Sequence, residues 1–113
     1  MSSKPPVRLQ RANVVVRDLD RALLFYRDVL GFNEEFRKPH NPDSYSFTVF
    51  DIPRDAIIGF CVLSAPGQSN VLALTQISGI PIPAVPSPRR SAIVLEVNDP
   101  DAVVAGAKKL GLH

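Results

Sequence analysis

The chain has 113 residues, of which 45% are hydrophobic and 21% charged, as is typical of one globular domain. The net charge is only +2, and the lysines and arginines are interspersed with acids, which argues against a nucleic-acid partner. No apolar run approaches the roughly 18 residues that span a bilayer, and the N-terminal segment lacks the apolar core of a secretory signal. We therefore expect a cytoplasmic protein with no membrane partner.

Residues 9–16 are predicted to form a strand, because they are rich in β-branched side chains toward their end. Asp18 is a good N-cap for a following helix, and Gly31 can take the left-handed conformation that ends it. Between them, apolar residues recur at helical spacing, which predicts one buried helix face that includes Tyr26. This face comprises Leu19, Ala22, Leu23, Tyr26, Val29 and Leu30.

Four further strands are predicted, at residues 32–37, 45–50, 57–64 and 70–77. The first two are separated by the turn-rich loop KPHNPDS, and the last two by the turn Ala65-Pro66-Gly67. The alternation in residues 45–50 predicts a half-buried strand, and Tyr45 and Cys61 are expected to be core residues rather than reactive ones. The segment GIPIPAVPSP contains four prolines, so an extended connector is expected there.

The end of the chain repeats its beginning. When Asp99 is placed on Asp18, residues 92–98 align with 11–17, and Leu110-Gly111-Leu112 aligns with Leu30-Gly31-Phe32 after a one-residue deletion. Such repetition predicts a strand–helix–strands module used twice. We predict a single domain over residues 1–113, with the first module at about 7–78, the proline-rich connector at 79–90 and the start of the second module at 91–113.

The second module is incomplete by comparison with the first. By repeat arithmetic, about 30 to 45 residues would be needed to complete it. Either the chain is a fragment, or another chain supplies the strands that are lacking. The sequence favours a fragment, since an unpaired half-sheet would expose strand edges and apolar surface.

The stretch VVVRDLDRALLFYRDVLGF resembles the opening of the vicinal oxygen chelate superfamily, and VLEVNDPDAVVAGAKKLGL resembles the opening of its second module. That superfamily includes glyoxalase I, extradiol ring-cleaving dioxygenases, and the fosfomycin and bleomycin resistance proteins. The resemblance spans nearly the whole chain. It implies an α+β fold of paired βαβββ modules, here with the second truncated, whose sheets curl around a central cavity, and it implies a homodimer. The matching residues are Val16, Asp18, Leu19, Ala22, Phe25, Tyr26, Leu30, Gly31 and Phe32, then Val97, Asp99, Ala102, Ala107, Leu110 and Gly111.

The resemblance also implies a divalent metal, such as Fe, Mn, Ni or Zn, held by His, Gln or Glu on the first and last strand of each module. The first-strand positions are occupied here by Arg11 and Ala92. The last strand of module one offers Ala73, or Thr75 after a two-residue slip. A guanidinium is cationic and alanine has no donor atom, so these residues do not suit a metal. His40 is expected to be a surface loop residue, and we expect no cofactor.

Strand alternation sends Arg11 and Asn13 toward the cavity, with Thr75 on the last strand and Glu96 in the second module. Arg11 would grip a carboxylate or phosphate, Asn13 would orient it, and Glu96 would act as a base or second acceptor. In a simpler interpretation, Arg11 and Glu96 reach solvent or pair with each other.

These observations leave several functions open. The chain could bind a small, possibly anionic molecule without the usual metal. It could be a divalent-metal-dependent lyase or ring-cleaving dioxygenase, or a sequestering protein like those of bleomycin resistance. A degenerate module that serves only as a structural partner is a further alternative. Arg11 favours an anionic ligand over a cationic drug.

Overall fold

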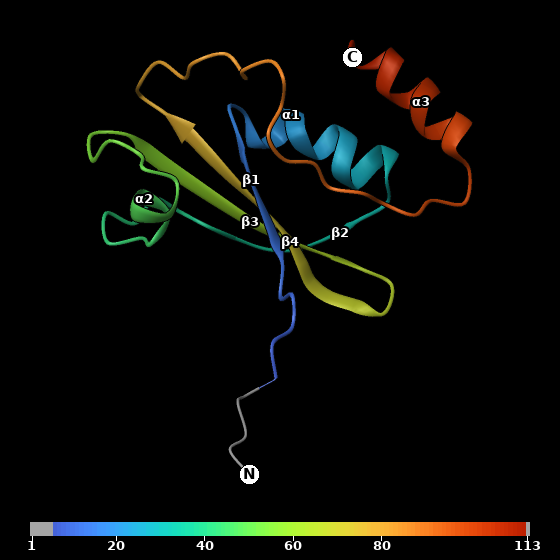
Figure 1. Cartoon of the computed structure of the whole chain (residues 1–113), viewed down its shortest axis with the longest axis horizontal. Helices are drawn as coiled ribbons and strands as arrows, with labels where there is room; N and C mark the ends of the chain where they lie inside the picture. Colours follow the sequence, from blue (N-terminus) through green and yellow to red (C-terminus); the bar gives the residue numbers. More distant parts are fainter. Residues whose placement is uncertain (1–5, 113) are drawn as a thin grey trace.

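The chain folds around one mixed four-stranded sheet, shown in Figure 1 by a computed structural model that describes residues 6–112. The strand order is β1-β4-β3-β2; β1 and β4 are parallel, and the other neighbours are antiparallel. The bounds are β1, Ala12–Val16; β2, Asn33–Lys38; β3, Ile57–Ala65; and β4, Gln68–Ser78. This α+β arrangement confirms the fold class predicted from the sequence.

Helices connect or follow these strands. Between β1 and β2 the chain forms α1, Leu19–Leu23, which continues without a break into a π-helix, η1, Leu24–Val29. Two more helices are α2, Ser46–Val49, and α3, Pro100–Lys109. Among the described residues, none of these helices has the length and apolar character that crossing a bilayer requires.

The predicted helix boundaries are confirmed by their capping contacts. The Asp18 carboxylate accepts a hydrogen bond of 3.1 Å from the Arg21 backbone N–H, and Asp99 accepts one of the same length from Ala102. Gly31 follows the helix with a φ of 90°, a conformation that side chains with a Cβ rarely adopt. The signals at residues 18–31 therefore act locally as the sequence predicts.

Apolar residues bury both faces of the sheet. Leu63 and Leu74 pack beneath α1 and η1, together with Leu19, Leu23 and the partly buried Val14. On the opposite face a second cluster forms between the strands and the α2 region. That cluster comprises Phe47, Ile52, Ala56, Ile58 and Ile77. The period-two alternation of β1 and β4 produces this two-sided arrangement, because successive side chains point to opposite faces.

Two predicted strands are absent from the structure. Residues 45–50 form the short helix α2 rather than a strand, with Phe47 buried and Tyr45 85% exposed, so the expectation of a core Tyr45 is also wrong. Residues 92–97 form no strand and are largely exposed, with Val94 at 93%. A strand needs a hydrogen-bonded neighbour, and no described segment pairs with this one.

The helix of the repeat, α3, packs on η1 and not on the sheet (Figure 1). Gly106 faces Val29 so closely that a Cβ at position 106 would lie 2.7 Å from Val29 Cγ1. The Arg21 guanidinium donates a hydrogen bond of 3.0 Å to the Leu110 carbonyl, at the end of α3. The segment before α3 is irregular, and Arg17 donates to the Ile82 carbonyl within it at 3.0 Å.

Candidate functional site

The face of the sheet opposite α1 carries the candidate site. On β1 and β4 this face carries Asn13 and Val15 together with the fully buried Ala73 and Thr75, and Arg11 immediately precedes β1. Leu72 and Leu74 lie on the helix side. We call the face that carries Asn13 the open face. Phe60, the register partner of Thr75 on β3, belongs to it too. Phe60 was not among the residues predicted for the site, although the alternation in residues 57–64 could have indicated its placement.

Asn13 and Thr75 meet on the open face, as strand alternation predicted for their side of the strands. Thr75 Oγ1 lies 2.8 Å from Asn13 Oδ1 and donates to it. Thr75 is fully buried, whereas Asn13 is exposed. The hydrogen bond occupies the Asn13 carbonyl oxygen, which leaves the two amide N–H donors of the exposed side chain free to face a ligand.

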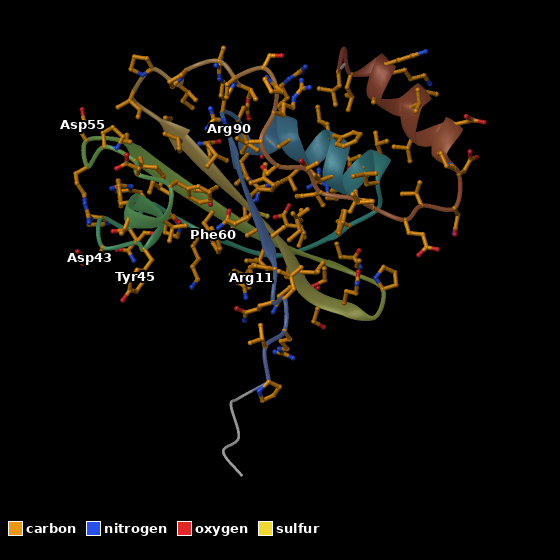
Figure 2. The ribbon with its side chains drawn as sticks, viewed as in Figure 1. Arg11, Asp43, Tyr45, Asp55, Phe60 and Arg90 are labelled. Carbon is orange, nitrogen blue, oxygen red and sulfur yellow. The ribbon has the colours of Figure 1, made fainter. Side chains whose placement is uncertain are left out.

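Arg11 lies immediately before β1 and is half-buried (Figure 2). It lines a hollow of about 420 Å³ together with residues 8–10 and 67–71, which include the β3–β4 turn. Its Nε is buried and makes no hydrogen bond to any described residue. A buried N–H without an acceptor costs about 1–3 kcal/mol, so Arg11 Nε lacks the acceptor that it needs.

Glu96 and Ala92 do not join these residues. Glu96 is exposed and lines a different hollow, of about 910 Å³, together with residues of η1, the β3–β4 turn and α3. The expected cavity-facing position of Glu96 is therefore wrong, because it depended on a strand at 92–97 that does not form. Ala92 lies in the same irregular, exposed segment.

The residues at the expected metal-ligand positions do not fit a divalent ion. Arg11 immediately precedes β1 and Ala73 lies on the neighbouring β4, but one is a cation and the other has no donor atom. Within residues 6–112, no group of three or more His, Cys, Asp and Glu side chains is placed to hold a metal. The described residues therefore offer no ligand set for a divalent ion.

His40 makes a contact that its loop position did not predict. It is exposed, as expected of a loop residue, but its Nδ1 accepts a hydrogen bond of 3.0 Å from the Ile58 backbone N–H. Its ring also meets the Phe47 ring edge-on, at 6.2 Å between centroids. Pro39 has no N–H with which to continue the β2–β3 ladder, but this alone does not indicate which acceptor the Ile58 N–H finds.

Cys61 and Tyr26 are structural residues. Burial raises the pKa of the Cys61 thiol, with a smaller contribution from the negative charge of Glu34. A thiol with a raised pKa is a poor nucleophile, and Cys61 is fully buried in the helix-side core. Burial likewise raises the pKa of Tyr26, which packs on the same cluster. Both observations confirm the expected core positions.

Comparison with known proteins identifies the family. The family model described as Glyoxalase/Bleomycin resistance protein/Dioxygenase superfamily matches residues 8–113. The chain therefore belongs to this superfamily, and the resemblance noted in the sequence is confirmed. No curated protein matches the chain.

Two solved structures share the fold. A glyoxalase family protein from Bacillus cereus is 21% identical, with a TM-score of 0.69 over 98% of this chain and 76% of that one. A glyoxalase family protein from Enterococcus faecalis is 16% identical, with a TM-score of 0.53 over 92% of this chain and 72% of that one. At these identities the likeness concerns the fold alone, so the function must be argued from the site.

Proposed function

We propose that this protein binds a small anionic molecule on the open face, without the metal that the superfamily commonly uses. The observation that carries the proposal is the buried, unpartnered Nε of Arg11, which lines a hollow large enough for a small ligand. An anionic oxygen from the ligand would supply the missing acceptor. A charge-assisted hydrogen bond of this kind is about twice as strong as a neutral one.

The residues of the open face that follow Arg11 along the chain, which are not among those that line its hollow, would supply further contacts to a ligand that extends past the hollow. The exposed Asn13 amide, oriented by Thr75, can donate to a second ligand oxygen. Phe60 and Val15 offer apolar surface on the same face. A carboxylate or phosphate attached to a small apolar body therefore suits the site best. A homodimer, which the family resemblance implies, and a cytoplasmic location, which the composition leads us to expect, belong to this proposal.

A titration with three anions tests the proposal: benzoate, phenylphosphonate and inorganic phosphate, followed by NMR at low ionic strength. Arg11→Met removes the charge, and Arg11→Lys keeps the charge but not the planar fork. Arg90→Met is a matched control, because Arg90 is an exposed arginine of the connector (Figure 2).

We expect at least one anion to bind. Arg11→Met should weaken the affinity by at least about tenfold, Arg11→Lys should weaken it less, and Arg90→Met should leave it unchanged. If no anion binds, or if Arg11→Met binds as tightly as the wild type, the proposal is wrong. Metal content per chain is measured in parallel by mass spectrometry. Near-stoichiometric Fe, Mn, Ni or Zn would instead support a metal-dependent lyase or dioxygenase.

A further inference from the structure

The hollow beside Arg11 lies where the ladder between β1 and β4 begins. The two strands pair from Ala12 and Leu72 onward, whereas β4 itself starts earlier, at Gln68. Residues 8–11 would have to continue β1 backward for the ladder to extend, but they form no strand. Residues 8–11 and 67–71 instead line the hollow of about 420 Å³. The hollow is thus a space that the sheet leaves between two segments that do not pair with each other.

The β3–β4 hairpin is irregular on its side of this hollow. A bulge shifts its register, and Asn70 has a φ of 55°, which residues with a Cβ seldom adopt. The Asn70 N–H donates a hydrogen bond of 2.7 Å to the Ser64 hydroxyl. Bulges are common beside binding sites, because they turn side chains away from the ladder. The bulge brings three neutral polar residues, Gln68, Ser69 and Asn70, to the border of the hollow.

The charged residues of the hollow are both positive. Arg8 and Arg11 border it, and its other lining residues are neutral. Because residues 8–11 form no strand, period-two alternation does not place the two arginines on opposite faces. Within residues 6–112 neither arginine forms an ion pair, and Arg11 Nε has no acceptor. Two cations without a counter-charge among the described residues therefore border one hollow.

A carboxylate would use only part of this lining. It carries one negative charge and two oxygens, which the planar fork of a single guanidinium satisfies. A phosphate monoester has nearly two negative charges at neutral pH and three strong acceptor oxygens. We propose that the hollow binds the dianionic phosphate group of a phosphate monoester, with Arg11 as the anchor and Arg8 as the residue that favours two charges over one. The amides of Gln10 and Gln68 and the Ser69 hydroxyl are donors for the remaining oxygen.

This inference rests on the proposed function, because it names the ligand class that the proposed anion site takes. The body of the ester would extend past the hollow along β1, toward the open face and its apolar residues Val15 and Phe60. Inorganic phosphate has the same charge but no such body. An ester with an apolar body should therefore bind more tightly than inorganic phosphate does.

The test compares ligands that differ in one property at a time, titrated into the full chain at pH 7.5 and low ionic strength and followed by NMR. Phenyl phosphate is a dianion at this pH, and methyl phenyl phosphate keeps the ring and the phosphorus centre with a single charge. Phthalate carries two charges on separate carboxylates. We expect the wild type to bind phenyl phosphate at least about fivefold more tightly than methyl phenyl phosphate, phthalate or inorganic phosphate.

Variants show whether Arg8 produces this preference, since any cationic protein favours a dianion to some extent. Arg8→Met should weaken phenyl phosphate about three- to fivefold, as expected for an exposed charge, and methyl phenyl phosphate by less than about twofold. Arg8→Lys keeps the charge and should restore the preference. Arg11→Met should weaken both esters, and Arg90→Met should change neither. Arg8 is exposed and precedes β1, so its variants should keep the fold, which their amide spectra verify.

The outcomes separate this inference from the proposed function. If both esters bind with equal affinity, or if Arg8→Met weakens them equally, the selectivity for a dianion is wrong, while anion binding at Arg11 stands. Phthalate that binds as tightly as phenyl phosphate would overturn recognition of the phosphate group. Inorganic phosphate that binds as tightly would overturn the role of the ester's body. If none of these anions binds, the proposed function is itself wrong, and this inference fails with it.

Discussion

Thr75 Oγ1 donates a hydrogen bond of 2.8 Å to Asn13 Oδ1, and this contact joins two parallel strands across 62 residues of sequence. Thr75 is fully buried, so its hydroxyl needs a partner, and Asn13 is the residue that supplies one. In turn, the contact fixes which end of the exposed Asn13 amide faces outward. The same bond thus stabilises the sheet and orients the candidate ligand-binding group.

Replacing Thr75 by valine should therefore destabilise the protein slightly and weaken anion binding. The two side chains are similar in shape, so the main effect is loss of the hydrogen bond, about 1 kcal/mol in the free energy of unfolding. Urea denaturation measures this loss, and the NMR titration measures binding. An Asn13→Ala variant and the double variant close a thermodynamic cycle. If the two single effects simply add, the pair is not coupled and the orienting role of Thr75 is refuted.

The contact of Gly106 with Val29 should make position 106 intolerant of any side chain. A Cβ there would meet Val29 Cγ1 at 2.7 Å, and the β-branched valine has few alternative rotamers. We expect Gly106→Ala to cost about 1–2 kcal/mol, despite the better helix propensity of alanine. In a Val29→Ala background the clash is removed, so the same change should instead stabilise α3 by about 0.5–1 kcal/mol. Urea denaturation of the four proteins measures both effects, and equal effects in the two backgrounds would contradict this packing.

Stability should decrease in acid partly because of Glu34. The hydrogen bond from Arg37, 2.8 Å, lowers the pKa of Glu34, and Arg27 at 3.1 Å adds to the effect. When the pKa of a carboxyl group is lower in the folded state than in the unfolded state, the ionised group stabilises the fold at pH values above the unfolded pKa, near 4.3. This contribution is lost as the pH falls through the folded pKa.

Glu34→Gln should therefore reduce stability at pH 7 by about 0.5 kcal/mol, as is typical of partly exposed pairs, and have a smaller effect below pH 3. Urea midpoints measured between pH 7 and 2.5 test this. Asp43→Asn is a suitable control, because Asp43 is exposed and belongs to none of the ion pairs found in residues 6–112. A constant difference between the wild type and Glu34→Gln at all pH values would contradict a stabilising role for the ionised Glu34 carboxylate.

The sequence predicted those elements whose signals are local. Asp18 and Gly31 bound the first helix through a cap and a positive φ, and both effects depend on nearby backbone atoms only. Strand alternation also predicted that Arg11, Asn13 and Thr75 share one face. Asn13 and Thr75 do meet there, because β1 and β4 are ordinary strands with one face against the helices.

The errors arose where distant partners decide the structure. Residues 45–50 alternate like a strand, yet burial of Phe47 against Ile58 and Ile77 favours one helical turn instead. Residues 92–97 have a strand-like composition but no described neighbour with which to pair, and this also removed Glu96 from the predicted site. The His40–Ile58 contact was missed because it depends on the β2–β3 register, which the composition of the loop does not reveal.

The register of β1 and β4 also predicts that a metal site can be introduced at the open face. Asn13 pairs with Ala73, which is fully buried, and Arg11 stands two residues before Asn13, so positions 11 and 73 lie diagonally across neighbouring strands, about 7–8 Å apart and within reach of long side chains. Arg11→His combined with Ala73→Glu would replace a cation and a methyl group by an imidazole and a carboxylate, both of which bind divalent ions. We expect this double variant to bind Ni²⁺ or Zn²⁺ at least about tenfold more tightly than the wild type, by calorimetry at pH 7.5.

Ala73→Glu alone is the control, since its carboxylate would face the Arg11 guanidinium and be occupied by it. Equal affinity of the wild type and the double variant would show either that the two positions do not converge or that the wild type already binds metal through other residues, and the metal content of the purified wild type distinguishes these cases.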